Sequence, residues 1–268
     1  MSSSFAEAAF VGITRVEGAD AHRRYNEWHQ LDHRPENLLL QGVAWGERWV
    51  RAPDCVPTVA EGPWHDFHYL NSYWLRPPAA ESVAEWASLA DRSLQWGRRP
   101  DVTIAQRPFM SFFRPVLGLA ARRVLVSPEA LVLRPTLGVH LTVLRADDDH
   151  RSRASVQEAA AWYAQVGFPS LVERHGVAGV WALSGAPELV PDDWARRESG
   201  STDRGALERL RIHLVFCDAD PVEVHESLTE GGLPGVLHAP VLADEVLFCG
   251  PLRAIRPWDW DWFDERGS

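Results

Sequence analysis

The chain has 268 residues, of which 46% are hydrophobic and 24% charged, and its formal net charge is −10. This length and composition are typical of a globular protein with one large or two small domains. The negative charge argues against nucleic acids and anionic membranes as partners, because both attract basic surfaces. No apolar run approaches the roughly 18 residues that span a bilayer, and the first residues lack the basic and apolar regions of a signal peptide.

Two further features of the composition narrow the chemistry. All 27 basic residues are arginine, and the absence of lysine excludes Schiff-base chemistry, a pyridoxal-phosphate anchor and a Walker A loop. The motifs GxGxxG, GxSxG and CxxC are also absent, so nucleotide-binding, α/β-hydrolase and dithiol redox functions lose their signatures. Three scattered cysteines, Cys55, Cys217 and Cys249, indicate reduced thiols, so we expect a cytoplasmic protein.

The first half of the chain predicts the order strand, helix, strand, strand, helix, strand. In chain order these elements span residues 9–16, 21–40, 42–50, 65–75, 82–96 and 104–113. Asp20 is the expected N-cap of the first helix, and Pro35 is expected to break it. Ser82 and Glu85 form a capping box that predicts the start of the second helix. Pro108 predicts an edge or bulge position in the last strand.

The second half predicts the same order. Its strands are expected at 138–145, 177–183, 210–217 and 241–248, and its helices at about 155–175 and at 221–228. An acidic loop, 147–149, precedes the first of these helices, and Asp220 is the expected N-cap of the second. A long polar loop covers 185–205. The aromatic and acidic segment 256–263 is expected to lie along the surface at one end of the fold.

A sequence repeat links the two halves. Trp28, Pro35 and Gly42-Val43 recur with identical spacing as Trp162, Pro169 and Gly176-Val177. The first copy also carries Tyr25, His29, Asp32 and His33, and the matching residues of the second copy are Ala159, Tyr163, Val166 and Gly167. The fold therefore does not require the histidines and the acid of the first copy, and we expect them to serve a functional site.

The βαββαβ order of each half predicts two tandem ferredoxin-like repeats, an α+β fold whose helices cover one face of an antiparallel sheet. The bare faces of the two sheets can pack against each other, which predicts a closed intrachain barrel with an interior cavity. We expect the first repeat over 1–118, a linker over 119–136 and the second repeat over 137–268. The third strands are expected to match, with His68 equivalent to His213. The lack of an aromatic RNP motif argues against the related RNA-recognition module.

The segment Tyr25-Asn-Glu-Trp28-His-Gln-Leu-Asp32-His33-Arg-Pro35, followed by Gly42-Val43 and Arg48-Trp49, resembles the EthD-like branch of the dimeric α+β barrel superfamily. Tandem members of this superfamily include chlorite dismutases, which bind haem, and the bacterial chalcone isomerase, which uses no cofactor. The bacterial chalcone isomerase is similar to this chain in length. It also has a histidine shortly before a proline at the end of the first helix, as His33 is placed here. The resemblance implies the barrel fold, but the superfamily spans cyclases, isomerases, monooxygenases and haem enzymes, so it does not determine the reaction.

The polar residues of the first helix are the candidate catalytic group. Four of them share one helix face through the spacing i, i+3, i+4 and i+7: Tyr25, Trp28, His29 and Asp32. His33 lies beside them, where the following proline is expected to end the helix at the mouth of the barrel. We predict His33 as the general acid/base, since an imidazole titrates near neutral pH, with Asp32, His29 or His68 orienting it. The alternatives are packing on the sheet for Trp28 and a solvated helix surface for His29 and Asp32.

Strand residues complete the predicted site. Tyr25 and Arg48 are expected to donate hydrogen bonds to a developing oxyanion. Arg48 would meet a carboxylate if its strand face points into the barrel, and it would be a solvated charge if that face points outward. The expected substrate-binding wall consists of Trp28, Trp45, Arg48, Tyr69 and Tyr73. The cavity is expected to draw its polar groups from residues 1–115 and an apolar wall from residues 137–250.

A metal or haem enzyme of the same fold is the first alternative. His29 and His33 have the i, i+4 spacing of metal ligands, and His65 or His68 would supply a third ligand, but the HExxH motif fails because position 30 is Gln. The candidate axial ligands of a haem are His140, His175 and His213. Because no metal or haem signature is complete, we expect no cofactor and a colourless, metal-free protein.

These observations predict a cofactor-independent enzyme that uses general acid/base catalysis on a small, apolar carbonyl or phenolic molecule. Isomerase, cyclase and lyase reactions fit this chemistry. A second alternative is a barrel that binds a small ligand without turnover. The expected partner is a small-molecule substrate, and no nucleic acid or membrane is expected. The sequence is compatible with a homo-oligomer.

Overall fold

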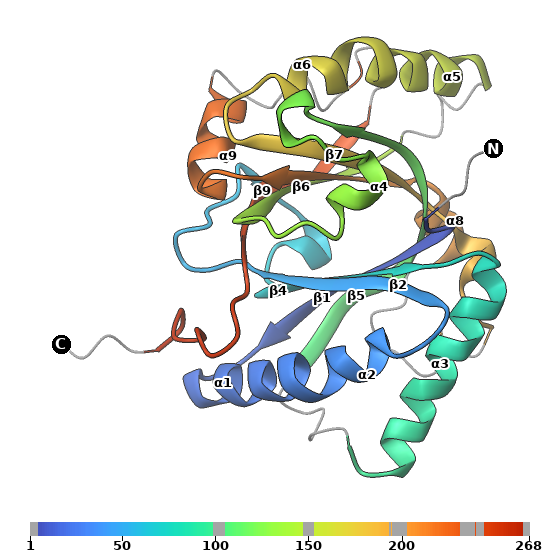
Figure 1. Ribbon diagram of the computed structural model, residues 1–268, viewed down its shortest axis with the longest axis vertical. Helices are drawn as coiled ribbons and strands as arrows, with labels where there is room; N and C mark the ends of the chain where they lie inside the picture. Colours follow the sequence, from blue (N-terminus) through green and yellow to red (C-terminus); the bar gives the residue numbers. More distant parts are fainter. Residues whose placement is uncertain are drawn as a thin grey trace.

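Two repeats of four strands form one closed antiparallel barrel (Figure 1). The computed structural model describes residues 5–98, 105–146, 153–192, 194, 203–230, 239 and 244–264. The strands are β1 (Ala8–Val16), β2 (Val43–Val50), β3 (Val59–Ala60), β4 (Tyr69–Leu75), β5 (Ala105–Ala120), β6 (Gly138–Arg145), β7 (Val177–Gly185), β8 (Leu210–Cys217) and β9 (Glu245–Ala254). The order is β2-β4-β1-β5 in the first repeat and β7-β8-β6-β9 in the second, with β3 added beside β9. The predicted pair of ferredoxin-like repeats is confirmed.

The two sheets join at their edges. β5 pairs with β7 over residues 113–120, and β2 pairs with β9 at Trp49 and Val50, which closes the barrel. β5 runs without interruption to Ala120, so it crosses residue 118, where the sequence analysis places the end of the first repeat. The last strand of each repeat therefore also belongs to the sheet of the other.

Helices cover the outer faces of both sheets (Figure 1). They are α1 (Ala19–Glu27), α2 (Arg34–Leu38), α3 (Ala79–Gln95), α4 (Pro128–Leu131), α5 (Arg153–Trp162), α6 (Phe168–Val172), α8 (Arg204–Glu208) and α9 (Pro221–Thr229). α1 begins just before the predicted N-cap Asp20, which lies in the first helical turn instead. Among the described residues, no helix combines the length and the apolar composition that crossing a bilayer requires.

Apolar side chains fill the barrel. Alternation along β1 sends Val11 and Ile13 inward, and inward positions of the other strands carry further buried residues. These are Leu70, Phe109, Phe113, Leu141, Val143, Ile212, Leu214 and Phe248. Trp64 and Phe67, from the loop before β4, pack against this group. An eight-stranded barrel is just wide enough for side chains to fill it. The prediction that the ligand cavity lies inside the barrel, with an apolar wall from residues 137–250, is therefore wrong.

The first helix does not break at Pro35. α1 continues into a π-helical turn, Trp28–His33, and then into α2. A proline in an α-helix lacks an N–H and clashes with the carbonyl four residues earlier. The π turn, whose hydrogen bonds reach five residues back, accommodates the proline without ending the helix. The second repeat has the same turn at Tyr163–Gly167 before Pro169, so the repeated proline accounts for a repeated backbone feature.

α3 begins three residues before its predicted start. The backbone N–H of Ala79 donates to the carboxylate of Glu7 at 2.8 Å, which satisfies one of the open donors of the first turn. Ser82 donates to a backbone carbonyl before the helix, and Glu85 accepts a hydrogen bond from the backbone N–H of Gly42 at 2.8 Å. The predicted capping box is therefore wrong, because both side chains fasten the helix to neighbouring segments.

Other predicted boundaries agree with the structure to within four residues, except that β5 ends seven residues and β9 six residues later than predicted. β4 begins four residues late, at Tyr69, because the 3₁₀ turn Gly62–Trp64 and the loop after it come first. The carboxylate of Asp220 caps α9 as predicted, at 2.9 Å from a backbone nitrogen. The acidic loop 147–149 and the first residues expected in the last strand, 241–243, lie outside the described residues.

The third strands of the repeats match with a shift of three residues. His213 pairs with the first and second strands of its repeat in the way that Asn71 does in the first repeat. His213 is therefore equivalent to Asn71, and His68 precedes β4 altogether. The predicted equivalence of the two histidines is wrong, since strand pairing and not local similarity sets the register.

Candidate functional site

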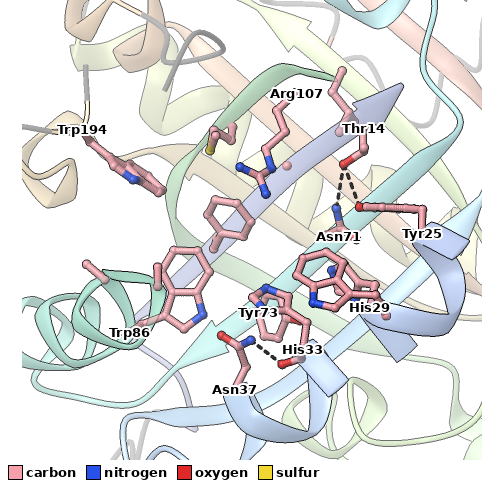
Figure 2. A pocket seen from close by; sticks show the side chains of 17 residues that line it. Thr14, Tyr25, His29, His33, Asn37, Asn71, Tyr73, Trp86, Arg107 and Trp194 are labelled. Atoms are coloured by element: carbon pink, nitrogen blue, oxygen red, sulfur yellow. Dashed lines mark hydrogen bonds between the residues drawn. The ribbon is translucent and has the colours of Figure 1, made fainter. Parts of the chain in front are cut away.

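A cavity lies between the first sheet and its covering helices, outside the barrel (Figure 2). The polar and aromatic side chains that line it include Thr14, Tyr25, Trp28, His29, His33, Asn37, Asn71, Tyr73, Trp86, Arg107 and Trp194. All of these except Trp194 belong to the first repeat, so the predicted origin of the polar groups is confirmed. The cavity leaves about 60 Å³ for the centres of water molecules. That is room for roughly four to six waters, whereas a cavity that holds a benzene ring measures about 150 Å³, so a ring-sized ligand would have to displace side chains of the wall.

A β-bulge brings a positive charge to the cavity. Ile13 of β1 lies opposite Phe109 of β5, whereas the next paired residue, Arg15, lies opposite Gln106. β5 therefore has one extra residue here, at the predicted Pro108 irregularity. Strict alternation would send Arg107 and Phe109 to the same, inward face. The bulge turns Arg107 to the helix-facing side, where it lines the cavity.

Glycine makes room for the ring of Tyr73. A Cβ atom at Gly46 would lie 2.4 Å from two ring carbons of Tyr73. The ring therefore lies across the backbone of β2 at this point. In the second repeat, the strand pairing puts Val180 and Val215 at the corresponding positions. The ring of Tyr73 thus requires a glycine at position 46 in the first repeat, and this ring lines the cavity.

We therefore expect Gly46→Ala to destabilise the fold by about 1–3 kcal/mol, the usual cost of forcing extra volume into a packed site. Urea unfolding would measure this loss. The variant Gly46→Ala/Tyr73→Val, which imitates the small residues of the second repeat, should recover most of the stability. A double variant as unstable as the single one would show that the ring contact is not the cause.

A chain of hydrogen bonds fixes the buried end of the cavity. The hydroxyl of Tyr25 donates to Thr14 Oγ1 at 3.1 Å, and Asn71 Nδ2 donates to the same oxygen at 3.3 Å (Figure 2). Arg48 Nε donates to Asn71 Oδ1 at 3.0 Å. The hydroxyl hydrogen of Tyr25 is thus directed to Thr14. Tyr25 presents an acceptor oxygen, and not the oxyanion donor that the sequence analysis expects.

The π turn sets which polar residues of the helix reach the cavity. His29 and His33 line it, whereas Asp32 is exposed in a shallow surface groove. The extra residue of the π turn moves His33 onto the face that an uninterrupted α-helix would give to Asp32. The second repeat behaves identically, since Gly167 is buried and Val166 is 48% exposed. The prediction that Asp32 shares the face of Tyr25 and His29 is therefore wrong.

The two histidines are in contact and differ in environment. Their ring centroids are 4.9 Å apart in an edge-to-face arrangement. His33 stacks on Trp28 at 4.7 Å and is half-buried, and its carbonyl accepts a hydrogen bond from Asn37. His29 is buried, and burial first, then the charges of Arg48 and His33, hold its pKa well below the ordinary value. His29 is therefore neutral at neutral pH.

Arg48 fits neither of the two predicted cases. It points away from the barrel interior, yet it is 0% exposed, because α1 and the π turn cover it. Its guanidinium lies over the rings of Tyr25 and Tyr69, at 5.0 and 5.1 Å from their centroids, and neither Nη atom has a hydrogen-bond partner among the described residues. Cation–π contacts take the place of a carboxylate. Arg48 does not line the cavity, so it acts on the site through the charge that it places near His29.

Three buried polar atoms of cavity residues have no hydrogen-bond partner within the part of the chain that the structure describes. They are His29 Nδ1, the hydroxyl of Tyr73 and Trp86 Nε1. Burial raises the pKa of Tyr73, so its hydroxyl stays protonated and is a donor. Unsatisfied buried polar groups are rare in folded proteins and are typical of functional sites. Each of them could bind a polar atom of a ligand.

Among the described residues that line the cavity, one carries a permanent positive charge, Arg107, and none is an aspartate or a glutamate. Tyr73 and Trp86 add neutral donors. The apolar part of the wall is aromatic, from Trp28, Trp86 and Trp194. The arrangement suits a small aromatic molecule that carries a negative or partly negative oxygen.

Several predicted site residues lie elsewhere. His68 accepts a hydrogen bond from the backbone N–H of Val16 and packs against His22 and Phe263, away from the cavity. Tyr69 lies behind Tyr25, and its hydroxyl contacts His22 and Asn26. Trp45 is on the inward face of β2, beneath the guanidinium of Arg34. The structure thus brings together Tyr25, Trp28, His29, His33 and Tyr73 and excludes Asp32, Trp45, Arg48, His68 and Tyr69 from the cavity wall.

Other cavity residues have no signal in the sequence that connects them with the site. The side on which Arg107 lies follows from the bulge, for which Pro108 is the only sequence signal. Asn37 and Trp86 lie on helices whose relation to the histidines depends on the fold. Trp194 comes from the second repeat, in the long loop after β7, and stacks on Phe112 of β5 at 4.9 Å. No local pattern connects these residues with His33.

Comparisons with known proteins bear on the fold. No family model and no curated protein matches the sequence. Among solved structures, a chlorite dismutase-like protein matches with a TM-score of 0.53 and 12% identity, over 94% of this chain and 95% of that chain. An anthrone oxidase-like protein matches with a TM-score of 0.51 and 11% identity, over 96% of this chain and 94% of that chain. The chain has a dimeric α+β barrel fold. Both halves of this barrel lie in one polypeptide, as the sequence analysis predicts.

Haem, which the resemblance to chlorite dismutases implies, does not fit this barrel's cavity. Room for roughly four to six waters is far too small for a tetrapyrrole, because indole rings occupy the space between sheet and helices. The predicted axial ligands also lie elsewhere. His140 and His213 are buried on the second sheet, and His175 is exposed after α6. The predicted third metal ligands, His65 and His68, do not line the cavity with His29 and His33.

Proposed function

We propose that the barrel is an enzyme that catalyses proton transfer on a small aromatic carbonyl or phenolic molecule without a cofactor. The observation that carries this proposal is the cavity itself, where a histidine pair, an arginine and a buried tyrosine hydroxyl meet within a wall whose described residues are largely aromatic and include no carboxylate. Isomerase, cyclase and lyase reactions all begin with such a proton transfer. The EthD-like affinity, the likeness to chalcone isomerase and the cytoplasmic location stay predictions.

The residues take distinct roles in this reaction. His33 removes the proton, since it is half-buried at the cavity and its neighbour His29 stays neutral. The rings of His29 and His33 are 4.9 Å apart, so a positive charge on His29 would repel one on His33. Because His29 is neutral, His33 can take up a proton without this repulsion. Arg107 and the hydroxyl of Tyr73 stabilise the oxygen on which negative charge develops. Trp28, Trp86 and Trp194 bind the ring of the substrate.

The likeness to an anthrone oxidase-like protein suggests a second candidate, the oxidation of a phenolic ring ketone by dioxygen. This reaction would also begin with proton removal by His33. An oxygen electrode distinguishes the two candidates. Consumption of dioxygen with an aryl ketone favours oxidation, and hydrogen exchange at the carbon beside the carbonyl without consumption favours isomerase-type chemistry.

The binding step can be tested with two ligands of nearly equal shape. We expect 4-nitrophenolate to quench the tryptophan fluorescence of the protein and 4-nitroaniline to bind more weakly. Arg107→Met should weaken phenolate binding by roughly 10–100-fold, the usual effect of losing a hydrogen bond to a charged group. It should change aniline binding by less than threefold. Isothermal titration calorimetry would measure both constants.

Arg92→Met is the matched control, because it removes the same charge from α3, where Arg92 donates to Ser88 and does not line the cavity. It should leave both constants unchanged. Equal weakening of both ligands by Arg107→Met would refute the oxyanion role of this residue. Binding without hydrogen exchange in any tested aryl ketone would favour the alternative of a barrel that binds a ligand without turnover.

A further inference from the structure

Three side chains of the second repeat converge far from the cavity. His140 on β6, Cys249 on β9 and His225 on α9 bring one nitrogen or sulfur atom each to a common point, and these atoms lie within 4.8 Å of one another. His140 and Cys249 are 0% exposed, and His225 is 6% exposed. Residues 85 and 24 positions apart in the chain meet here, so the sequence spacing contains no metal-binding motif.

Two of the three distances between these atoms are close to the edges of a metal coordination tetrahedron, and the third is at most 4.8 Å. His140 Nε2 lies 3.1 Å from His225 Nδ1 and 3.7 Å from Cys249 Sγ. For zinc, bonds of about 2.05 Å to nitrogen and about 2.3 Å to sulfur give tetrahedral edges of about 3.3 Å and about 3.6 Å. An ion at the centre would therefore bind all three atoms with only small movements of the side chains.

A residue from the first repeat contacts one of the three side chains and the backbone of a second. Thr58 Oγ1 lies 3.1 Å from His225 Nε2, the nitrogen that faces away from the cluster. A proton on Nε2 that is donated to Thr58 leaves the lone pair of Nδ1 directed at the cluster, as in most metal-binding histidines. The backbone N–H of Thr58 also donates to the carbonyl of Cys249 at 2.8 Å. Thr58 therefore holds a ligand on α9 and a ligand on β9 at once.

We propose that His140, His225 and Cys249 bind one zinc ion that fastens α9 to β6 and β9. Two imidazoles and a thiolate form a ligand set that zinc accepts readily, with water in the fourth position. Zinc replaces the proton of the thiol when it binds, so the buried cysteine becomes a thiolate only in the metal complex. The site lies on the second sheet, does not contact the cavity and does not rest on the proposed function.

The test begins with the full-length wild-type chain. After purification with a chelator, the protein is titrated with Zn²⁺, and bound metal is measured by mass spectrometry after gel filtration. We expect one zinc per chain. At a free zinc concentration of about 100 times the dissociation constant, the Tm should rise by roughly 5–10 °C. Co²⁺ in place of zinc should give the thiolate-to-cobalt charge-transfer band and the intense visible bands of a tetrahedral site.

Variants identify the ligands. Cys249→Ala and His225→Gln should lose the bound zinc and the rise in Tm. Cys217→Ala, which removes an equally buried thiol of β8, and His33→Ala, which removes one of the other paired histidines, should keep both. The cobalt spectrum of the wild type supports the proposal even where a variant fails to fold. A wild type that binds no zinc, or a loss of zinc in Cys217→Ala or His33→Ala, would overturn it.

Discussion

Replacing His33 by alanine is expected to slow proton transfer by roughly 10²–10⁴, the usual contribution of a general acid/base. His33 lines the cavity and stacks on Trp28, which holds its ring in place. The adjacent His29 cannot take over its role, because burial and the charge of Arg48 hold the pKa of His29 well below the ordinary value. A base with so low a pKa accepts a substrate proton poorly.

The same substitution should cost little stability. The second repeat has Gly167 at the equivalent position of an identical π turn, so this backbone does not need the imidazole. His33 is half-buried at the edge of the helix. We expect the free energy of unfolding to fall by no more than about 1 kcal/mol, a value typical of substitutions outside the core.

Hydrogen–deuterium exchange of aryl ketones in D₂O, followed by NMR, would measure the rate, and a urea titration would measure stability. The rate of the wild type should follow a titration near neutral pH that is absent from His33→Ala. Asp32→Ala is the matched control, since Asp32 is the exposed neighbour on the outer side of the helix. Unfolding of His33→Ala would make His33 a structural residue, and normal turnover would contradict its role as the base.

The fold could be predicted because it depends on patterns that repeat along the chain. The spacing of Trp28, Pro35 and Gly42 recurs in the second half, and each half has the same order of strands and helices. Alternating apolar residues then place one face of each sheet inward. Such local patterns do not reveal how completely side chains occupy the interior of the barrel. Trp64 and Phe67 come from a loop, and their insertion between the inward side chains is a tertiary event.

The site was predicted only in part, because two single-residue shifts of the backbone change which side chains reach it. The π turn exchanges Asp32 for His33 on the helix face, and the bulge turns Arg107 outward from the barrel. Prolines, Pro35 and Pro108, accompany both shifts, but a proline alone does not specify a π turn or the side of a bulge. Arg48 was ambiguous for a related reason, since its aromatic partners come from a helix and another strand.

Acid is expected to destabilise the barrel well above the pH at which carboxylates protonate. Two buried histidines of the first repeat, His22 and His29, resist protonation in the folded protein. Burial and the nearby His68 lower the pKa of His22 to about 4, and burial, Arg48 and His33 lower that of His29 well below its ordinary value. The unfolded chain binds a proton at each residue near pH 6.5. Acid therefore favours the unfolded state from pH 6.5 downward, and this loss of stability continues until the folded protein also takes up the protons.

The size of the effect follows from linkage. Each such histidine lowers the free energy of unfolding by about 1.4 kcal/mol per pH unit between its two pKa values. His22 alone should remove roughly 1.5–2 kcal/mol between pH 6.5 and pH 5, which is substantial beside the 5–15 kcal/mol that stabilises a typical domain, and His29 acts in the same direction. Burial also lowers the pKa of His68, which acts in the same direction. Urea titrations at half-unit pH steps would give the free energy of unfolding as a function of pH.

The change in the free energy of unfolding per pH unit shows which histidines resist protonation, whereas the stability at a single pH does not. His22→Gln and His29→Gln should each reduce the slope between pH 6 and pH 5 by up to about 1.4 kcal/mol per pH unit, even where the loss of a ring contact lowers the stability at pH 7. His65→Gln replaces an exposed histidine of the same repeat and should leave the slope unchanged. Arg48→Met tests the electrostatic cause, since removing this charge should raise the pKa of His29 and move its titration, followed by NMR, toward neutral pH. A free energy of unfolding that stays constant down to pH 4.5 would show that these histidines already carry protons in the folded protein.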